Sequence, residues 1–172
     1  MPSEHGYSFR PMTHADLPLV AGWLAQPHVA RWWDDAGTSL AHIEEHLGPA
    51  DSVEPFLILM DERPIGYVQS YDIHAEADHP YRDQPAGTIG IDLSIGEPDL
   101  VGRGHGPRAL DAFVRRLFDA GVPRAVIDPD PANAAAVRAY AKAGFIPLDE
   151  RHTVYGHALL MARDRSNDQS AS

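Results

Sequence analysis

The chain has no cysteine among its 172 residues. Disulfide bonds, a thiol nucleophile and thiolate metal sites are therefore excluded. The sequence also lacks an apolar run long enough to span a membrane, and its first residues show no signal-peptide pattern. These absences lead us to expect a cytoplasmic protein.

Basic residues are few, because 14 Lys and Arg stand against 25 Asp and Glu, which gives a formal net charge of −11. Such a surface repels nucleic acid phosphates, so neither DNA nor RNA is expected as a partner, and it attracts a cationic small molecule. Solubility alone is the simpler interpretation of the same charge. The length predicts a single domain over residues 1–172, with a frayed polar tail at 164–172.

The most informative stretch runs from Gly90 to Gly121. Residues 90–96 alternate apolar and polar side chains, which predicts a strand. After a turn, residues 101–106 carry three glycines and lead into a helix with a regular apolar stripe. Glycine lets the backbone approach a ligand closely, and a helix N-terminus favours an anion. The segment is either a pyrophosphate cradle or only a tight turn, and it matches neither the dinucleotide fingerprint nor the Walker A pattern.

The other expected elements are shorter and are read from periodicity and turn residues. We expect strands at 7–11, 55–60, 65–73, 124–127, 145–146 and 158–161, and helices after Thr13, at 27–30, at 39–47 and at 133–143, the last one ended by Gly144. Residues 55–60 and 65–73 form an antiparallel hairpin in this prediction. Residues 74–87 are rich in His, Asp and Pro and are expected to form a loop that is long enough to suggest a function.

Two further motifs have competing interpretations. His42, Glu45 and His46 match the H-x-x-E-H pattern of inverted zinc peptidases, but a solvated helix face explains them more simply, and we expect no metal. Trp33 and Asp34 lie in a Trp-Trp-Asp-Asp run. That run is either a core anchor with capping acids or an aromatic and acidic wall for a cationic ligand.

Residues 101–106 and Asn133-Ala-Ala-Ala-Val-Arg-Ala-Tyr140-Ala-Lys-Ala-Gly144-Phe145 together resemble the GCN5-related N-acetyltransferases. The first segment is similar to the family motif Q/R-x-x-G-x-G/A, with Val101 where Gln or Arg is usual. The second segment resembles the family's Asn…Tyr…Lys-x-Gly-Phe signature. The resemblance implies an α/β (α+β) fold, with a mixed, mostly antiparallel sheet flanked by helices and splayed where acetyl-coenzyme A enters.

Within this family the chain looks like the aminoglycoside 6′-N-acetyltransferases. The similarity extends from Phe9 to about Met161 and includes Asp92 and the Asp-Pro pattern at Asp128. The loop 74–87 departs from the subgroup, because Tyr81 stands where paired tryptophans are common. A sister subgroup that acetylates hydroxylysine-type amines for siderophores usually has a histidine in place of Asp92.

The resemblance also implies which residues bind acetyl-coenzyme A. The strand residues would offer backbone groups to the pantetheine and thioester, and the glycine loop would hold the pyrophosphate. The implied residues are Leu93, Ser94, Ile95, Val101, Gly102, Arg103, Gly104, His105, Gly106, Asn133, Ala136, Tyr140 and Lys142.

The implied reaction is the attack of a neutral amine on a thioester, which needs a base because an alkyl ammonium is mostly protonated at neutral pH. Asp92 is the candidate base, or alternatively a strand residue that caps a turn. Tyr140 is the candidate acid for the leaving thiolate, or alternatively a core tyrosine. The candidate binding residues for a cationic amine are Trp33, Asp34, Gln69, Asp72, Asp78, Asp92 and Asp128.

The alternative acceptors are siderophore hydroxylysine-type amines, polyamines and peptide amines. A non-catalytic acyl-coenzyme A-binding module that docks a basic protein tail is a further alternative. We expect a monomer or a homodimer.

Overall fold

The computed structural model describes residues 6–33, 36–47, 52–153 and 156–170. Its elements follow in the order β1 (Tyr7–Pro11), η1 (His14–Asp16), α1 (Leu17–Leu24), α2 (Pro27–Ala30), α3 (Ala36–Glu45), β2 (Val53–Met60), β3 (Arg63–Asp72), β4 (Ile89–Ile95), η2 (Pro98–Leu100), α4 (His105–Asp119), β5 (Arg124–Ile127), α5 (Ala134–Lys142), β6 (Ile146–Thr153), β7 (Gly156–Asp164) and α6 (Arg165–Ser170).

Across the described residues, seven strands form one mixed sheet in the order β1-β2-β3-β4-β5-β7-β6. β1 and β2 are antiparallel, and β7 is antiparallel to both of its neighbours, whereas β4 and β5 are parallel. The mixed, mostly antiparallel sheet flanked by helices is thus confirmed. Contacts divide the chain into unit 1 (Met1–Gln69 and Leu93–Ala109) and unit 2 (Ser70–Asp92 and Leu110–Ser172).

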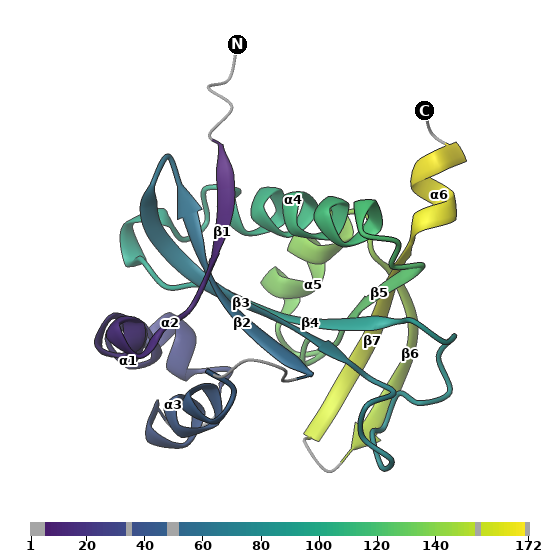
Figure 1. The fold of residues 1–172 in the computed structure, drawn as a ribbon, viewed down its shortest axis with the longest axis horizontal. Coiled ribbons are helices and arrows are strands. Elements are labelled where there is room, and N and C mark those ends of the chain that lie inside the picture. The colour runs from purple at the N-terminus through teal and green to yellow at the C-terminus, as the bar shows by residue number, and fades with distance from the viewer. Residues whose placement is uncertain (1–5, 34–35, 48–51, 154–155, 171–172) are drawn as a thin grey trace. The chain divides into compact units, whose positions relative to one another are not determined.

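In unit 1 the helices α1, α2 and α3 gather beside β1 and β2 (Figure 1). The chain enters η1, which leads directly into α1, through a capping box in which the Thr13 backbone N–H donates to Asp16 at 2.9 Å. α1 then buries Val20, Trp23 and Leu24 against a core that includes β2 and β3 residues. The apolar residues of this helix thus pack into the core of unit 1.

Within unit 1, the backbone that follows β4 lies close to α1, because Gly96 has no side chain. A Cβ at this position would collide with the indole ring of Trp23. The backbone N–H groups of Gly96 and Glu97 both donate to the carbonyl of Ile65, at 2.8 and 3.2 Å, so the pairing ends in an irregular turn. Glu97 also accepts a hydrogen bond from the Trp23 indole at 2.6 Å.

Unit 2 is built on the β5, β7 and β6 strands and on the part of α4 that begins at Leu110. Its strands bury Val126 and Leu160, and α4 buries Phe113 and Val114. β6 and β7 extend to 146–153 and 156–164 and are longer than the two short strands that the sequence predicts. The sequence pattern of β6 was too polar to reveal this length, because the strand is exposed along most of its residues.

Within the tail that the sequence predicts to be frayed, residues 165–170 form the helix α6 at the end of β7 (Figure 1). Asp168 on this helix accepts hydrogen bonds from the buried Arg163 at 2.6 and 3.1 Å. This tertiary ion pair orders a segment whose own sequence has little apolar content.

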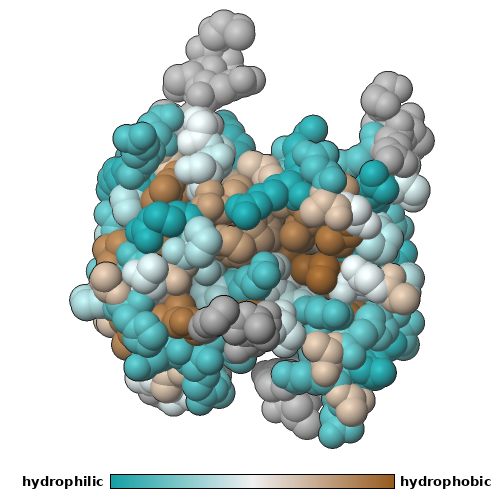
Figure 2. Space-filling view, viewed as in Figure 1, coloured by the Kyte–Doolittle hydropathy of each residue, from teal (hydrophilic) through white to brown (hydrophobic). Residues whose placement is uncertain are grey.

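Figure 2 shows hydrophilic side chains over much of the viewed face, with apolar side chains between them, as expected for a chain with 23% charged and 44% hydrophobic residues. None of the helices in the described ranges has the length and apolar content that crossing a membrane requires.

Candidate active site

Two aspartates and a tyrosine from three elements of unit 2 form the centre of the candidate site. Asp92 lies in β4, Asp128 directly follows β5, and Tyr140 lies on α5. β4 and β5 are parallel neighbours in which Gly90 is opposite Val126. Because both strands continue in the same direction for two more residues, this register brings Asp92 opposite Asp128.

The electrostatics of these three groups show that they act on one another. Burial, followed by the negative charge of Asp92, raises the pKa of Asp128 to about 7. Burial, followed by the charges of Asp92 and Asp128, raises the pKa of Tyr140 above its usual range. The cluster therefore combines carboxylates that can bind an ammonium group with a phenol that stays protonated at neutral pH.

Tyr81 joins this cluster, although it is absent from the site residues that the sequence predicts. Its hydroxyl donates to Asp128 Oδ2 at 2.6 Å, and the side chain is almost fully buried. Burial, the charge of Asp128 and the hydrogen bond to it raise the pKa of Tyr81 far above its usual value. The hydroxyl therefore acts as a donor. The two residues are 47 positions apart, so no local pattern reveals their contact.

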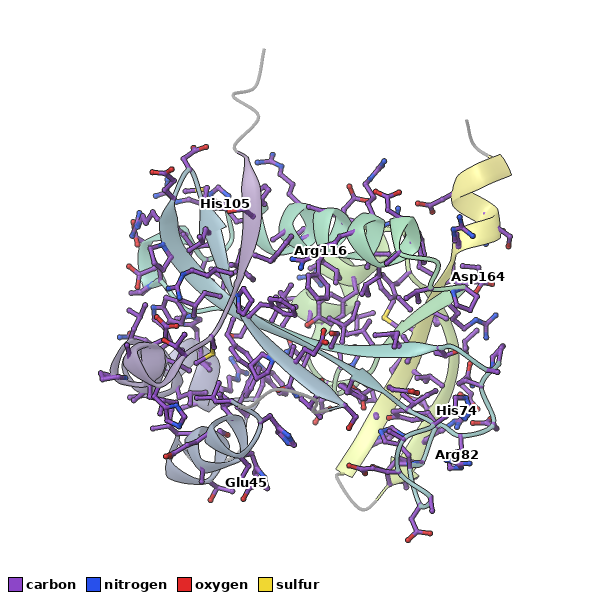
Figure 3. The ribbon with its side chains drawn as sticks, viewed as in Figure 1. Glu45, His74, Arg82, His105, Arg116 and Asp164 are labelled. Atoms are coloured by element: carbon purple, nitrogen blue, oxygen red, sulfur yellow. The ribbon has the colours of Figure 1, made fainter. Side chains whose placement is uncertain are left out.

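The loop that carries Tyr81, residues 73–88, is held by its own side chains. Arg82 donates to the carbonyls of His74 and Glu76, both at 2.9 Å, and His74 Nε2 lies 3.0 Å from the carbonyl of Gln84. Figure 3 shows His74 and Arg82 beside each other on this loop. These hydrogen bonds give the loop a defined conformation within unit 2.

Two neighbours hold the ring of Tyr81 itself. The guanidinium carbon of Arg151 lies 5.5 Å from the ring centroid, and His79 lies between Tyr81 and Tyr71 with centroid distances of 5.4 and 5.6 Å. Arg151 also forms an ion pair with Asp83 at 2.7 Å. These contacts from β6 and from the loop fix the ring whose hydroxyl reaches Asp128.

The glycine segment 101–106 lies in unit 1 and leads into α4. Gly102 and Gly104 have φ of +76° and +85°, a region that favours glycine, whereas Gly106 lies within the helix and has no positive φ. A Cβ at Gly102 would meet no described atom within 4 Å, and one at Gly104 would meet only Arg108. Val101 and Arg103 are exposed. The geometry suits an anion at a helix N-terminus.

His105 is buried, unlike the exposed Val101 and Arg103 of this segment. Its Nδ1 lies 2.7 Å from the hydroxyl of Tyr7 on β1. The two rings meet edge to face at 6.2 Å. Figure 3 shows His105 at the start of α4. Its imidazole therefore connects the glycine segment to the sheet of unit 1.

The strand residues Leu93, Ser94 and Ile95 are all partly buried. The carbonyl oxygen of Ile95 lies 2.9 Å from His28 Nε2, so one backbone group of this segment already has a side-chain partner. Gly66 packs against the backbone of Ser94 so closely that any side chain there would collide with it.

Asn133, Ala136 and Lys142 lie on or beside α5 in unit 2. Asn133 is the N-cap, and its Oδ1 accepts the Ala136 N–H at 3.2 Å. Lys142 is exposed in the last turn. Asn133 of the sequence signature thus caps the helix that carries Tyr140.

Trp33 and Gln69 both contact Tyr67 in unit 1. Trp33 meets the ring of Tyr67 edge to face at 6.0 Å, and Gln69 Oε1 accepts a hydrogen bond from the Tyr67 hydroxyl. Trp33 and Tyr67 also line a small, largely apolar pocket with Trp23, Ser94 and other residues. At least one face of the Trp33 side chain therefore packs against the core of unit 1.

The remaining predicted acids are not gathered into the cluster of Asp92 and Asp128. Asp72 is exposed and accepts the backbone N–H of His74 at 2.9 Å, and Asp78 is exposed on the loop. Asp34 lies outside the described residues. The structure thus brings together Asp92, Asp128 and Tyr140, and it adds Tyr81.

The H-x-x-E-H motif lies at the exposed end of α3. His42 and Glu45 lie 3.8 Å apart on α3 with about two thirds of each side chain exposed, and Figure 3 shows Glu45 at the end of that helix. Among the described residues, no group of three or more His, Cys, Asp or Glu side chains is arranged to hold a metal ion.

Comparison with known proteins gives a family match. The model of an acetyltransferase (GNAT) domain matches residues 12–153. The aminoglycoside N(6′)-acetyltransferase type 1 of Klebsiella pneumoniae is 33% identical over 171 residues, which cover 95% of this chain and 85% of that protein. The lysine N-acyltransferase MbtK of Mycolicibacterium paratuberculosis is 28% identical, over 92% of this chain and 73% of its own length.

A solved structure agrees with this match. The aminoglycoside acetyltransferase AAC(6′)-Ib in complex with coenzyme A and kanamycin superposes with a TM-score of 0.85 and 32% identity, over 97% of this chain and 100% of that one. The similarity therefore covers both units of the chain.

Proposed function

Since the chain belongs to the GNAT acetyltransferase family, we propose that it transfers the acetyl group of acetyl-coenzyme A to the 6′-amine of an aminoglycoside. The observation that carries this proposal is the pair of facing carboxylates, Asp92 and Asp128, beside the protonated Tyr140. Two acids side by side fit a cationic amine, and the net charge of −11 attracts such a molecule.

The residues that we propose bind the acetyl donor fit a nucleotide with a diphosphate. Acetyl-coenzyme A supplies a thioester as the acetyl source. The open backbone at Gly102 and Gly104 and the N–H groups at the start of α4 would hold its pyrophosphate, with Arg103 adding positive charge from the exposed side. The backbone of Leu93, Ser94 and Ile95 would face the pantetheine arm.

On the acceptor side, Asp92 and Asp128 would bind the ammonium group and orient it. Asp92 would take the proton from the amine nitrogen, directly or through water, because only the neutral amine is a nucleophile. The second carboxylate, Asp128, would lower the cost of removing the ammonium from water. Trp33, Gln69, Asp34, Asp72 and Asp78 remain candidates for contacts with the rest of the substrate.

Tyr140 would complete the reaction by donating its phenolic proton to the leaving sulfur. Its raised pKa keeps the proton on the oxygen at neutral pH, as a general acid requires. The donor of the reaction and the absence of cysteine both agree with a cytoplasmic location.

An acceptor screen tests the proposal. Purified protein is incubated with acetyl-coenzyme A and, in separate reactions, kanamycin, lysine derivatives and polyamines, and the release of the thiol is measured. We expect the highest kcat/KM for kanamycin. A preference for lysine derivatives would instead favour the second candidate, a lysine N-acyltransferase, for which the similarity to MbtK is the supporting observation. Binding of acetyl-coenzyme A without turnover of any amine would indicate a non-catalytic module.

A further inference from the structure

The hydroxyl of Tyr81 makes a short hydrogen bond of 2.6 Å to Asp128, which is one of the two facing carboxylates. Only 2% of the tyrosine is exposed, and its ring lies against Arg151 on one element and His79 on another. A side chain held this firmly fixes the position of the oxygen atom that it contacts. Tyr81 therefore determines how the carboxyl group of Asp128 is oriented.

Several charged or titratable groups act on this pair. Asp92 on β4 raises the pKa of Asp128, whereas the Tyr81 hydroxyl and a backbone N–H at Asp128 lower it. Tyr140 on α5 is affected by both carboxylates, and the charge of Arg151 on β6 acts on Tyr81. The remaining neighbour, His79, has a pKa that burial lowers, so its imidazole is neutral at neutral pH.

We propose that Tyr81 is a positioning residue that orients Asp128 beside Asp92 and favours its ionised form, so that the acceptor site can present two negative charges to a cationic amine. This inference rests on the proposed function and assigns a role to the loop 73–88. Through Tyr81 the loop supports a carboxylate of the site. Its contribution is one hydrogen bond to a carboxylate that burial and a like charge would otherwise neutralise.

The hydrogen bond from Tyr81 determines the direction in which the pKa of Asp128 changes. A donor to a carboxylate stabilises the charged form and therefore lowers its pKa. When the donor is removed, Asp128 takes up a proton at a higher pH, and the site loses one negative charge in the neutral range. The acidic limb of the pH profile of kcat/KM for the amine then moves to higher pH.

Tyr81→Phe is the direct test, because the ring and its contacts with Arg151 and His79 are kept while the hydroxyl is lost. A hydrogen bond to a charged group stabilises by roughly 1.5 kcal/mol, which corresponds to about one pH unit. We expect the acidic limb to move up by about one unit and kcat/KM at pH 7 to fall about fivefold, because the ionised fraction of Asp128 falls from about one half to about one tenth. The KM for acetyl-coenzyme A is expected to stay constant, and the two profiles are expected to converge at alkaline pH.

Two controls separate this role from a structural one. Tyr71→Phe removes a hydroxyl from the cluster of rings formed by Tyr71, His79 and Tyr81 but keeps the donor to Asp128. The acidic limb of this variant is expected to coincide with that of the unaltered protein. In Asp128→Asn the titrating carboxylate is gone, so adding Tyr81→Phe is expected to cause no further shift of the limb. Loss of stability alone would lower the amount of active protein at every pH and would leave the shape of the profile unchanged.

A measurement without turnover distinguishes failure of this inference from failure of the proposed function. The carboxyl carbon resonance of Asp128 can be followed by NMR as a function of pH in the protein without ligands. A midpoint that rises in Tyr81→Phe supports the inference whichever amine is acetylated. An unchanged midpoint, or an acidic limb that stays in place while the unaltered protein acetylates its amine, overturns it.

Discussion

The hydroxyl of Tyr7 lies 2.7 Å from Nδ1 of His105 and joins β1 to the first turn of α4. The histidine is buried, so the contact fixes the end of the glycine segment from inside the protein. Arg108, one turn further along α4, also interacts with this tyrosine. The contact gives unit 1 a defined geometry at the place where we propose that a pyrophosphate binds.

Tyr7→Phe tests the link between this contact and the donor site. A neutral hydrogen bond contributes about 1 kcal/mol, and a loss of this size that is fully coupled to binding changes the affinity about fivefold. We expect the dissociation constant for coenzyme A, measured by calorimetry, to rise several-fold while the KM of the amine stays constant. An unchanged dissociation constant would show that the contact does not contribute to the binding of the donor.

Asp92→Asn tests the proposed base. The amide keeps the shape of the side chain but cannot accept the proton of the ammonium group, so we expect kcat to fall at least about 100-fold. The affinity for coenzyme A, measured by calorimetry, is expected to stay near that of the unaltered protein. Asp119→Asn, which changes an exposed acid at the end of α4, is the matched control for the lost charge. Equal kcat values for Asp92→Asn and this control would reject the base role.

Tyr140→Phe tests the proposed acid. Without the hydroxyl, the leaving sulfur has to depart without a proton from the enzyme, and we expect the rate of the chemical step to fall on the order of 100-fold. Single-turnover kinetics measure this step separately from product release. A rate equal to that of the unaltered protein would exclude Tyr140 from the proton transfer.

Arg163→Ala tests the stability of unit 2. This arginine is 7% exposed and donates to Asp111, to the carbonyl of Ala143 and to Asp168, with shortest distances of 2.8, 2.8 and 2.6 Å. Removal leaves two partly buried carboxylates without this partner, so we expect the free energy of unfolding to fall by about 3 kcal/mol in urea titrations.

Arg115→Ala is the control for this change, because Arg115 pairs with the same Asp111 at 2.9 Å but is 67% exposed in its side chain. An exposed pair of this kind contributes less than about 0.5 kcal/mol. Similar losses for the two variants would mean that the buried position of Arg163 adds nothing to the stability of unit 2.

The metal content of the purified protein tests the interpretation of the H-x-x-E-H motif. We expect no stoichiometric zinc by elemental analysis and no loss of acetyl transfer after treatment with a chelator, because His42 and Glu45 are exposed and His46 follows the end of α3. One zinc ion per chain together with peptidase activity would contradict this interpretation.

Local signals predicted much of the fold. The alternation in residues 90–96, the Asn133 cap and Gly144 at the end of α5 each act within a few residues, and β4 and α5 lie where they were expected. Gly144 has a φ of +91°, which its place after the helix requires. The long strand β6 and the helix α6 were not predicted because they are stabilised by pairing and by an ion pair with Arg163 rather than by their own composition.

The site was predicted only in part for the same reason. Asp92, Asp128 and Tyr140 came from the family resemblance, and the parallel register of β4 and β5 gives a physical reason for the two acids to face each other. The contacts Tyr81–Asp128 and Tyr7–His105 join residues 47 and 98 positions apart. Neither contact has a local sequence signal, so both required the folded chain.

The most direct test of the central claim is to identify the product of the unaltered protein. Kanamycin and acetyl-coenzyme A that carries a ¹³C-labelled acetyl group are incubated with the enzyme, and the labelled site is assigned by NMR. The account predicts a single labelled acetamide at the 6′-nitrogen. Absence of any labelled aminoglycoside, or a label at another nitrogen, would contradict it.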